Sequence, residues 1–236
     1  MKINFKPASP LEKFAFRIYN LLVENFSKTF FVGGMVRDML LGKKIVDIDI
    51  TTIATPAQVV KILQQEGLKY TEVARNFGVI SAIEGDSEIE IASFREDRYI
   101  KNRYPKIRLV EDVRKDSKRR DFTINSLYLS LKSDEVLDFN NGLEDLKQKF
   151  IKFIGKAEQR ILEDPLRILR AFRFALDLQF KIEKNSFAAI KQNIHLLSTL
   201  TSSRTEKEIK KSRGIATQKI LKNILDKPEL VDKYFI

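Results

Sequence analysis

The sequence contains no cysteine and a single histidine, His195. The absence of cysteine excludes disulfide bonds and thiolate metal sites, and it is typical of a protein that works in a reducing cytoplasm. One histidine makes a histidine-based zinc site and a Ser-His-Asp catalytic triad implausible. Any metal site in this chain therefore has to use carboxylate ligands.

Long hydrophobic runs are also missing. No apolar stretch approaches the roughly 20 residues that a helix needs to span a bilayer, and residues 1–6 lack the apolar core of a signal peptide. We therefore expect a cytoplasmic protein with no membrane partner. With 236 residues, 43% of them hydrophobic and 32% charged, the chain is long enough for one large globular domain or two small ones.

Basic residues exceed acidic ones. The net charge of +11 predicts a polyanionic partner. The excess is concentrated in residues 98–120, with ten Lys or Arg against three acids, and in residues 181–236, with twelve against six. Each run alone is explained by a solvated surface, but two basic regions beside candidate phosphate chemistry favour nucleic acid.

A pair of glycines, Gly33 and Gly34, follows the apolar run 30–32 and precedes a short helical run, residues 36–41. Glycine lets the backbone approach a ligand closely, and the N–H groups at a helix start favour an anion. The pair predicts a triphosphate site, although glycines before a helix usually form no more than a turn.

Two carboxylates follow shortly after the glycines. Residues 45–50 alternate aliphatic side chains with Asp47 and Asp49, which predicts a strand with both carboxylates on one face and Val46 buried on the other. Adjacent carboxylates repel, so they need a cation, and Mg²⁺ completed by substrate phosphates suits them. A solvated strand face is the plainer alternative. Glu90, in a further predicted strand, is a possible third acid.

The remaining pattern divides the chain into two parts. We predict helices over 10–27 and 56–66, strands over 78–84, 88–94 and 136–139, and an irregular basic stretch over 95–120. After about residue 144 only helical periodicity remains. We therefore expect a mixed α/β domain over residues 1–150 and a basic all-helical domain over residues 151–236.

Four motifs occur in order along the chain: residues 33–38 with 47–49, residues 119–126, residues 138–146 and residues 163–174. Together they resemble the successive motifs of the class II tRNA nucleotidyltransferase and bacterial poly(A) polymerase family. The resemblance implies an α+β fold, with a polymerase-β-like nucleotidyltransferase head followed by an all-α neck domain. Full-length members continue into body and tail domains, which we expect to be reduced or absent here.

The resemblance also implies roles for individual residues. Asp47 and Asp49 would be the catalytic, metal-binding pair that holds two Mg²⁺ ions. The residues that would bind the nucleotide are Gly34, Arg37, Arg120, Asp121, Asp164, Arg167, Arg170 and Arg173. Among them, Gly34 and Arg37 would take the triphosphate, while Arg120 and Asp121 would lie beside the ribose and phosphates.

Base selection is assigned by the resemblance to Asp164 and Arg167. A carboxylate accepts and a guanidinium donates. This pair therefore matches C and A, which show an exocyclic amine beside a ring-nitrogen acceptor, and mismatches U and G. Without the family, Asp164 before Pro165 would be interpreted as a helix N-cap and the arginines as an exposed stripe.

The implied activity is template-independent, Mg²⁺-dependent addition of C, C and A from CTP and ATP to the 3′ end of tRNA. Addition of CC only or A only, and poly(A) synthesis, stay open. One reason is that residues 94–105, which resemble the family's flexible loop, are about one residue short. An inactive RNA-binding module is the remaining alternative, and the oligomeric state is left open.

Overall fold

The computed structural model describes residues 5–72, 74–99 and 105–235. These residues fold into two compact units. The first unit contains the described residues up to 99 together with 105–120 and 125–142, and the second contains 121–124 and 143–235. The division thus falls between Gly142 and Leu143, whereas the sequence led us to expect a boundary near 150.

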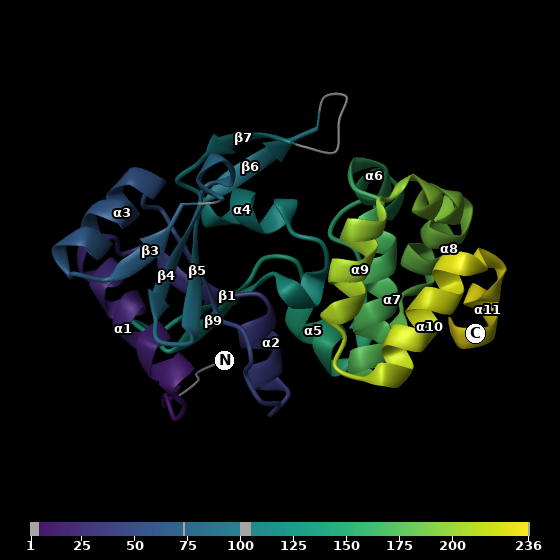
Figure 1. Cartoon of the computed structure of the whole chain (residues 1–236), viewed down its shortest axis with the longest axis horizontal. Helices are drawn as coiled ribbons and strands as arrows, with labels where there is room; N and C mark the ends of the chain where they lie inside the picture. Colours follow the sequence, from purple (N-terminus) through teal and green to yellow (C-terminus); the bar gives the residue numbers. More distant parts are fainter. Residues whose placement is uncertain (1–4, 73, 100–104, 236) are drawn as a thin grey trace. The chain divides into compact units, whose positions relative to one another are not determined.

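The first unit is built on a seven-stranded sheet with the strand order β3-β4-β5-β2-β1-β8-β9 (Figure 1). Neighbouring strands are antiparallel except for β2 and β5, which are parallel. The elements up to β5 are α1 (Pro10–Asn25), β1 (Thr29–Val32), α2 (Gly34–Leu40), β2 (Asp49–Thr52), α3 (Pro56–Gln65), β3 (Lys69–Thr71), the 3-10 turn η1 (Arg75–Phe77), β4 (Val79–Glu84) and β5 (Ser87–Ser93). Those that follow are β6 (Arg95–Arg98), β7 (Lys106–Leu109), α4 (Val113–Arg119), η2 (Thr123–Asn125), β8 (Leu127–Ser130) and β9 (Glu135–Asp138).

Both expected helices of the first unit form. Ser9 caps α1 and exchanges hydrogen bonds with Glu12, and Thr55 caps α3 and does the same with Gln58. In each helix a proline occupies the first position, where a missing N–H costs nothing. These local signals confirm the helices predicted over 10–27 and 56–66.

The inner strand β1, between β2 and β8, is buried on both faces. Phe31 stacks on Tyr19 of α1 at 4.9 Å between ring centroids, while Phe30 and Val32 pack with Tyr128 on the other face. Alternate residues of a strand point to opposite faces. The sheet therefore has one face covered by α1 and a second face, marked by Val32 and Tyr128, that carries the candidate site.

The prediction that residues 95–120 form an irregular stretch is wrong. β6 and β7 form a separate antiparallel ribbon, and α4 follows with Asp112 as its N-cap. The ribbon is held by backbone pairing and by charged side chains, so it lacks the apolar pattern by which a strand is recognised from sequence. Residues 100–104 of the predicted flexible loop lie outside the described residues.

The second unit is mainly helical. Its elements are α5 (Gly142–Lys147), which starts at the division, β10 (Phe150–Ile151), α6 (Ala157–Glu163), α7 (Leu166–Leu178), β11 (Lys181–Ile182), α8 (Lys184–Asn193), η3 (Ile194–Thr199), α9 (Ser202–Lys210), α10 (Ile215–Asp226), η4 (Pro228–Leu230) and α11 (Val231–Phe235). Its core includes Phe122, whose ring lies 4.9 Å from that of Phe153 and 5.7 Å from that of Phe174.

The expectation that residues 151–236 contain no strands needs one correction. β10 and β11 pair in parallel, with Phe150 opposite Lys181 and Ile151 opposite Ile182. Two residues are too few to show a period of two, so the sequence pattern does not reveal such a pair.

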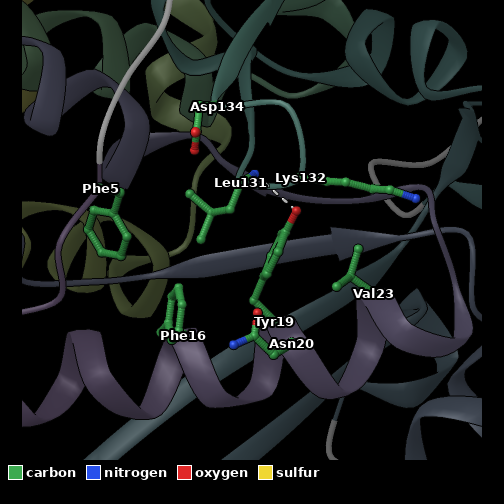
Figure 2. A pocket seen from close by; sticks show the side chains of 8 residues that line it. All are labelled: Phe5, Phe16, Tyr19, Asn20, Val23, Leu131, Lys132 and Asp134. Carbon is green, nitrogen blue, oxygen red and sulfur yellow. Dashed lines mark hydrogen bonds between the residues drawn. The ribbon is translucent and has the colours of Figure 1, made fainter.

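A pocket of about 460 Å³ lies in the first unit between α1 and the turn that follows β8. Figure 2 shows its aromatic side, where the hydroxyl of Tyr19 accepts a hydrogen bond from the Leu131 amide at 3.0 Å. The described residues that line it include none of the predicted site residues. Among the described residues, no helix is both long and apolar enough to cross a membrane.

Candidate active site

Asp49 is the first residue of β2 and lies in a row of residues that crosses the sheet. It is paired with Val32 of β1, which is paired in turn with Tyr128 of β8. Residues directly opposite each other in neighbouring strands project to the same face. The side chains of Asp49 and Tyr128 therefore leave the sheet on the same side, on either side of Val32.

Gly33, directly after Val32, brings two charged groups together. A Cβ added to Gly33 would lie 3.6 Å from Asp49 Oδ2 and 3.8 Å from Arg120 Nη1. The backbone of Gly33 has φ 77° and ψ −132° at the N-terminus of α2, a conformation that suits glycine. A carboxylate and a guanidinium thus both lie beside Gly33.

Asp47 lies outside the strand, which corrects the prediction that residues 45–50 form one. Regular pairing begins only at Asp49, because that residue is the first to face both β1 and β5. Val46, expected to be buried, is 62% exposed, while Ile48 is fully buried between the two aspartates. Asp47 itself is exposed.

The chemistry of these donors fits Mg²⁺, which commonly takes only one or two carboxylates and fills its shell with water and phosphate oxygens. Glu90 is opposite Asp49 in the parallel β2–β5 pair. Nevertheless, the described residues contain no group of three or more acids or histidines that could hold a metal ion. The structure therefore gives Glu90 no place in a three-carboxylate site.

Arg37 is buried beneath the glycine pair. Its guanidinium forms an ion pair with Asp38 at 2.9 Å and donates to Asn125 Oδ1 at 2.5 Å. The same guanidinium also approaches Gly34, because Nη2 lies 3.6 Å from where a Cβ of Gly34 would be. Arg37 thus supports the turn from the interior, and Asn125 holds the Arg37 guanidinium.

Arg120 belongs to a buried network that sequence reasoning missed. Its Nε donates to the Tyr128 hydroxyl at 2.9 Å, and its Nη2 donates to Asp116 Oδ2 at 3.3 Å. Burial opposes the charge of Arg120, but the attraction of Tyr128 and Asp116 outweighs it and raises the pKa of the guanidinium. Arg120 therefore keeps its positive charge at every physiological pH.

Asp116 is the centre of this network and is completely buried. Burial alone would raise its pKa, yet the charges of Arg119 and Arg120 hold the pKa of this carboxyl below its usual range. Asp116 precedes these arginines by three and four residues, the spacing of ion pairs on a helix. That spacing is the sequence signal by which it could have been found.

In the second unit, Asp121 is paired with Arg170. Its Oδ2 accepts a hydrogen bond from Nε of Arg170 at 2.8 Å and forms an ion pair with Nη2 at 2.8 Å. Arg170 and Arg173 also share Glu208 of α9, at 3.2 and 2.5 Å. Burial opposes the charge of Arg170, but Asp121 and Glu208 outweigh it and raise its pKa. The arginines of α7 are thus joined to acids rather than forming an exposed stripe.

Asp164 lies between α6 and α7. One oxygen accepts from the Leu166 amide, in the first turn of α7, at 3.1 Å. Both oxygens also accept from Nη2 of Arg204, at 3.0 and 2.9 Å. The sequence pattern indicated Asp164 as the N-cap, whereas the N-cap of α7 is Pro165 and Asp164 is the C-cap of α6.

Arg167 is buried in the first turn of α7. Its Nη1 donates to Glu163 at 2.7 Å and to the Arg160 carbonyl at 2.8 Å, and Arg160 forms a short ion pair with the same glutamate. Glu163 ends α6 and Arg167 is the second residue of α7, so this ion pair joins two helices and does not follow from the spacing within one. The contacts of Arg204 and Glu208 come from α9 and have no local signal.

Comparisons with known proteins identify the family. The sequence profile described as the poly A polymerase head domain matches residues 29–152. A CCA-adding enzyme of Streptococcus uberis is 41% identical over 186 residues, which are 78% of this chain and 45% of that protein.

Solved structures are similar as well. The Bacillus stearothermophilus CCA-adding enzyme in complex with CTP matches with a TM-score of 0.74 and 31% identity, over 86% of this chain and 47% of that one. A tRNA nucleotidyltransferase complexed with a primer tRNA and an incoming ATP analog matches with a TM-score of 0.68 and 31% identity, over 86% and 58%. The chain spans about half the length of the curated relatives it matches. Because the head-domain profile covers more than half of it, the chain belongs to the poly A polymerase head domain family of nucleotidyltransferases.

Proposed function

We propose that this chain adds C, C and A to the 3′ end of tRNA, using CTP and ATP, in a cytoplasmic and Mg²⁺-dependent nucleotidyl transfer. The observation that carries the proposal is the convergence of Asp49 Oδ2 and Arg120 Nη1 beside Gly33. Support for the substrates comes from the relatives, which are CCA-adding enzymes and complexes with CTP, an ATP analog and tRNA.

In this proposal, Asp47 and Asp49 hold Mg²⁺ through their carboxylates. The chemistry that Mg²⁺ supplies at such a pair is activation of the attacking hydroxyl and neutralisation of the leaving pyrophosphate. Arg120 places a permanent positive charge beside the glycine pair, where it binds the triphosphate. Arg37, already engaged with Asp38 and Asn125, keeps the Gly33–Gly34 turn in the shape that admits phosphate.

The second unit supplies base recognition in the same proposal. The Asp164 carboxylate accepts from the exocyclic amine of C or A, and Arg167 donates to the neighbouring ring nitrogen. Asp121 and Glu208 hold Arg170, and Glu208 also holds Arg173, so that α7 presents a rigid edge. U and G would leave both recognition groups unpaired, and a site built on such hydrogen bonds rejects mismatched partners strongly.

The test is incubation of the protein with tRNA that lacks its 3′ CCA, with each nucleoside triphosphate separately and with CTP and ATP together. Three added nucleotides, C, C and A, are the expected product. Two added C residues, a single A or a long homopolymer would instead identify CC addition, A addition or poly(A) synthesis.

Asp49→Asn is the variant that tests the metal site, because it preserves the size of the side chain and removes the charge that would hold the metal. We expect it to raise the activation barrier by several kcal/mol and so to lower the rate of incorporation at least about 100-fold. Binding of tRNA should persist in this variant. Unchanged incorporation would remove Asp49 from the metal site, and no incorporation by the unaltered chain would favour an RNA-binding module.

A further inference from the structure

Asp116 of α4 is a fully buried carboxylate to which the proposed chemistry gives no role. Among the described residues of the first unit, four groups donate hydrogen bonds to it. Oδ1 accepts from the Arg95 amide at 3.3 Å and from Arg119 Nε at 2.7 Å. Oδ2 accepts from the Tyr128 hydroxyl at 2.8 Å and from Arg120 Nη2 at 3.3 Å. A buried charge persists only when it is paired in this way.

The two oxygens of Asp116 serve different parts of the unit. Oδ1 is fixed by the first residue of the β6–β7 ribbon and by α4 itself. Oδ2 faces the sheet, where Tyr128 lies in the same cross-strand row as Asp49. Hydrogen bonds to both oxygens fix the orientation of the carboxylate in the structure.

Arg120, Tyr128 and Asp116 form a closed triangle. Tyr128 donates to Asp116 and accepts from Arg120 Nε, while Arg120 Nη2 donates to Asp116. The guanidinium carbon also lies over the Tyr128 ring, 5.2 Å from its centroid. These contacts fix the plane of the Arg120 guanidinium, although an arginine side chain can adopt many rotamers.

The contacts of Arg120 with Tyr128 and Asp116 determine where its remaining nitrogen, Nη1, lies. With Nε and Nη2 held by the triangle, Nη1 lies next to Gly33, where Asp49 Oδ2 also lies. We propose that Asp116, together with Tyr128, is a positioning residue that orients Arg120 towards the phosphates of the incoming nucleotide. This inference rests on the proposed function, because it takes the ligand at Gly33 to be a nucleoside triphosphate.

A purely structural role for Asp116, tying α4 to the sheet, is the competing explanation. Asp116→Asn separates the two, because it keeps the shape but turns one acceptor end into an NH₂ donor. Both oxygens of Asp116 accept from donors, so in either orientation of the amide its NH₂ group would face a hydrogen-bond donor. Asp112→Ala is the matched control: it removes the N-cap of the same helix and leaves the contacts of Arg120 in place.

The measurement is the affinity for CTP, by titration calorimetry, together with KM and kcat for incorporation. We expect Asp116→Asn to weaken CTP binding and raise KM about tenfold, the size of one lost charged hydrogen bond, with a smaller change in kcat. Tyr128→Phe should weaken CTP binding severalfold in the same direction. Asp112→Ala should lower thermal stability and leave CTP affinity within about twofold.

A double-mutant cycle gives the readout that a structural role would not produce. If Asp116 acts through Arg120, then adding Asp116→Asn to Arg120→Ala weakens CTP binding no further than Arg120→Ala alone. Additive losses would overturn the proposal, as would unchanged CTP affinity in Asp116→Asn. If Asp116→Asn does not fold, Tyr128→Phe decides, and unchanged affinity in that variant overturns the proposal.

Failure of the proposed function is distinguishable from failure of this inference. A chain that binds CTP but adds nothing to tRNA contradicts nucleotide addition, while the calorimetric comparison of the variants still tests Asp116. A chain that adds nucleotides normally with Asp116→Asn refutes the positioning role alone. A chain that binds no CTP at all refutes both.

Discussion

Arg204 donates from one guanidinium nitrogen to both oxygens of Asp164, at 3.0 and 2.9 Å. The carboxylate that we propose for base recognition is therefore already held by a charged partner within the second unit. An ionised carboxylate has about four acceptor positions, so it can keep this partner and still accept from a base amine. Arg204 thus orients the carboxylate rather than competing with the base.

Changes at this pair should alter the choice of nucleotide. Asp164→Ala removes the acceptor for the exocyclic amine, and we expect the preference for CTP over UTP, measured as the ratio of kcat/KM values, to fall at least tenfold. Arg204→Ala should lower the same ratio by a smaller factor, about threefold, because the acceptor remains but is less well oriented. Arg167→Ala should also loosen the choice.

Lys191→Ala provides the comparison for these variants, because it breaks an exposed ion pair with Asp232 in the same unit. Exposed pairs contribute little, so selectivity should not change. An unaltered preference for CTP in Arg167→Ala would remove that residue from base recognition.

Gly33→Ala should abolish nucleotide addition at a moderate cost in stability. The new Cβ would meet its neighbours at ordinary contact distances, so the cost comes from the positive φ of 77° and is of order 1–3 kcal/mol. The methyl group would also occupy the space beside Asp49 and Arg120.

Gly42→Ala is the matched variant for Gly33→Ala. Its φ is 64° and nothing lies within 4 Å of the added Cβ, so a strain of about 1–2 kcal/mol is expected without any effect on the site. Denaturant unfolding measures the loss of stability in each variant, and an incorporation assay measures the loss of nucleotide addition. Equal activity in the two variants would separate Gly33 from nucleotide binding.

The buried carboxylate of Asp116 should make stability depend on acid. Arg119 and Arg120 outweigh its burial and lower its pKa, so the unfolded chain binds a proton at a higher pH than the folded chain does. Its stabilising contribution is therefore complete above the unfolded pKa of about 3.9 and is lost as the pH falls through the lower folded value.

Asp116→Asn carries no such charge. The difference in free energy of unfolding between the original chain and this variant should be largest at about pH 5–7 and should shrink below about pH 4. Urea unfolding at a series of pH values measures it. A difference that stays constant down to about pH 3 would show that the charge of Asp116 does not stabilise the fold.

Binding of tRNA should weaken steeply with salt. The chain carries a net charge of +11, and each phosphate neutralised by Lys or Arg releases counterions, so the logarithm of the affinity should fall linearly with the logarithm of the salt concentration. Filter binding between roughly 50 and 200 mM salt measures the slope. A flat response would contradict a basic RNA-binding surface.

The elements that could be predicted from sequence were those with local signals. The capping boxes at Ser9 and Thr55 specify the starts of α1 and α3 by contacts within four residues. Alternating side chains likewise indicated β4 and β5. The ribbon of β6 and β7 could not be predicted, because backbone pairing joins its strands and β6 consists of charged residues such as the ion-paired Arg95 and Asp97.

The candidate site divides in the same way. Residue types and their order along the chain determined which groups are available: two aspartates near a glycine pair, an arginine at position 120, and Asp164 with Arg167. The tertiary structure alone decided their partners, since Tyr128 of β8 meets Arg120 at the end of α4, and Arg204 meets Asp164 across 40 residues of chain. A sequence specifies periodicity and charge locally, but the direction in which a buried arginine points depends on which acceptors the fold brings to it.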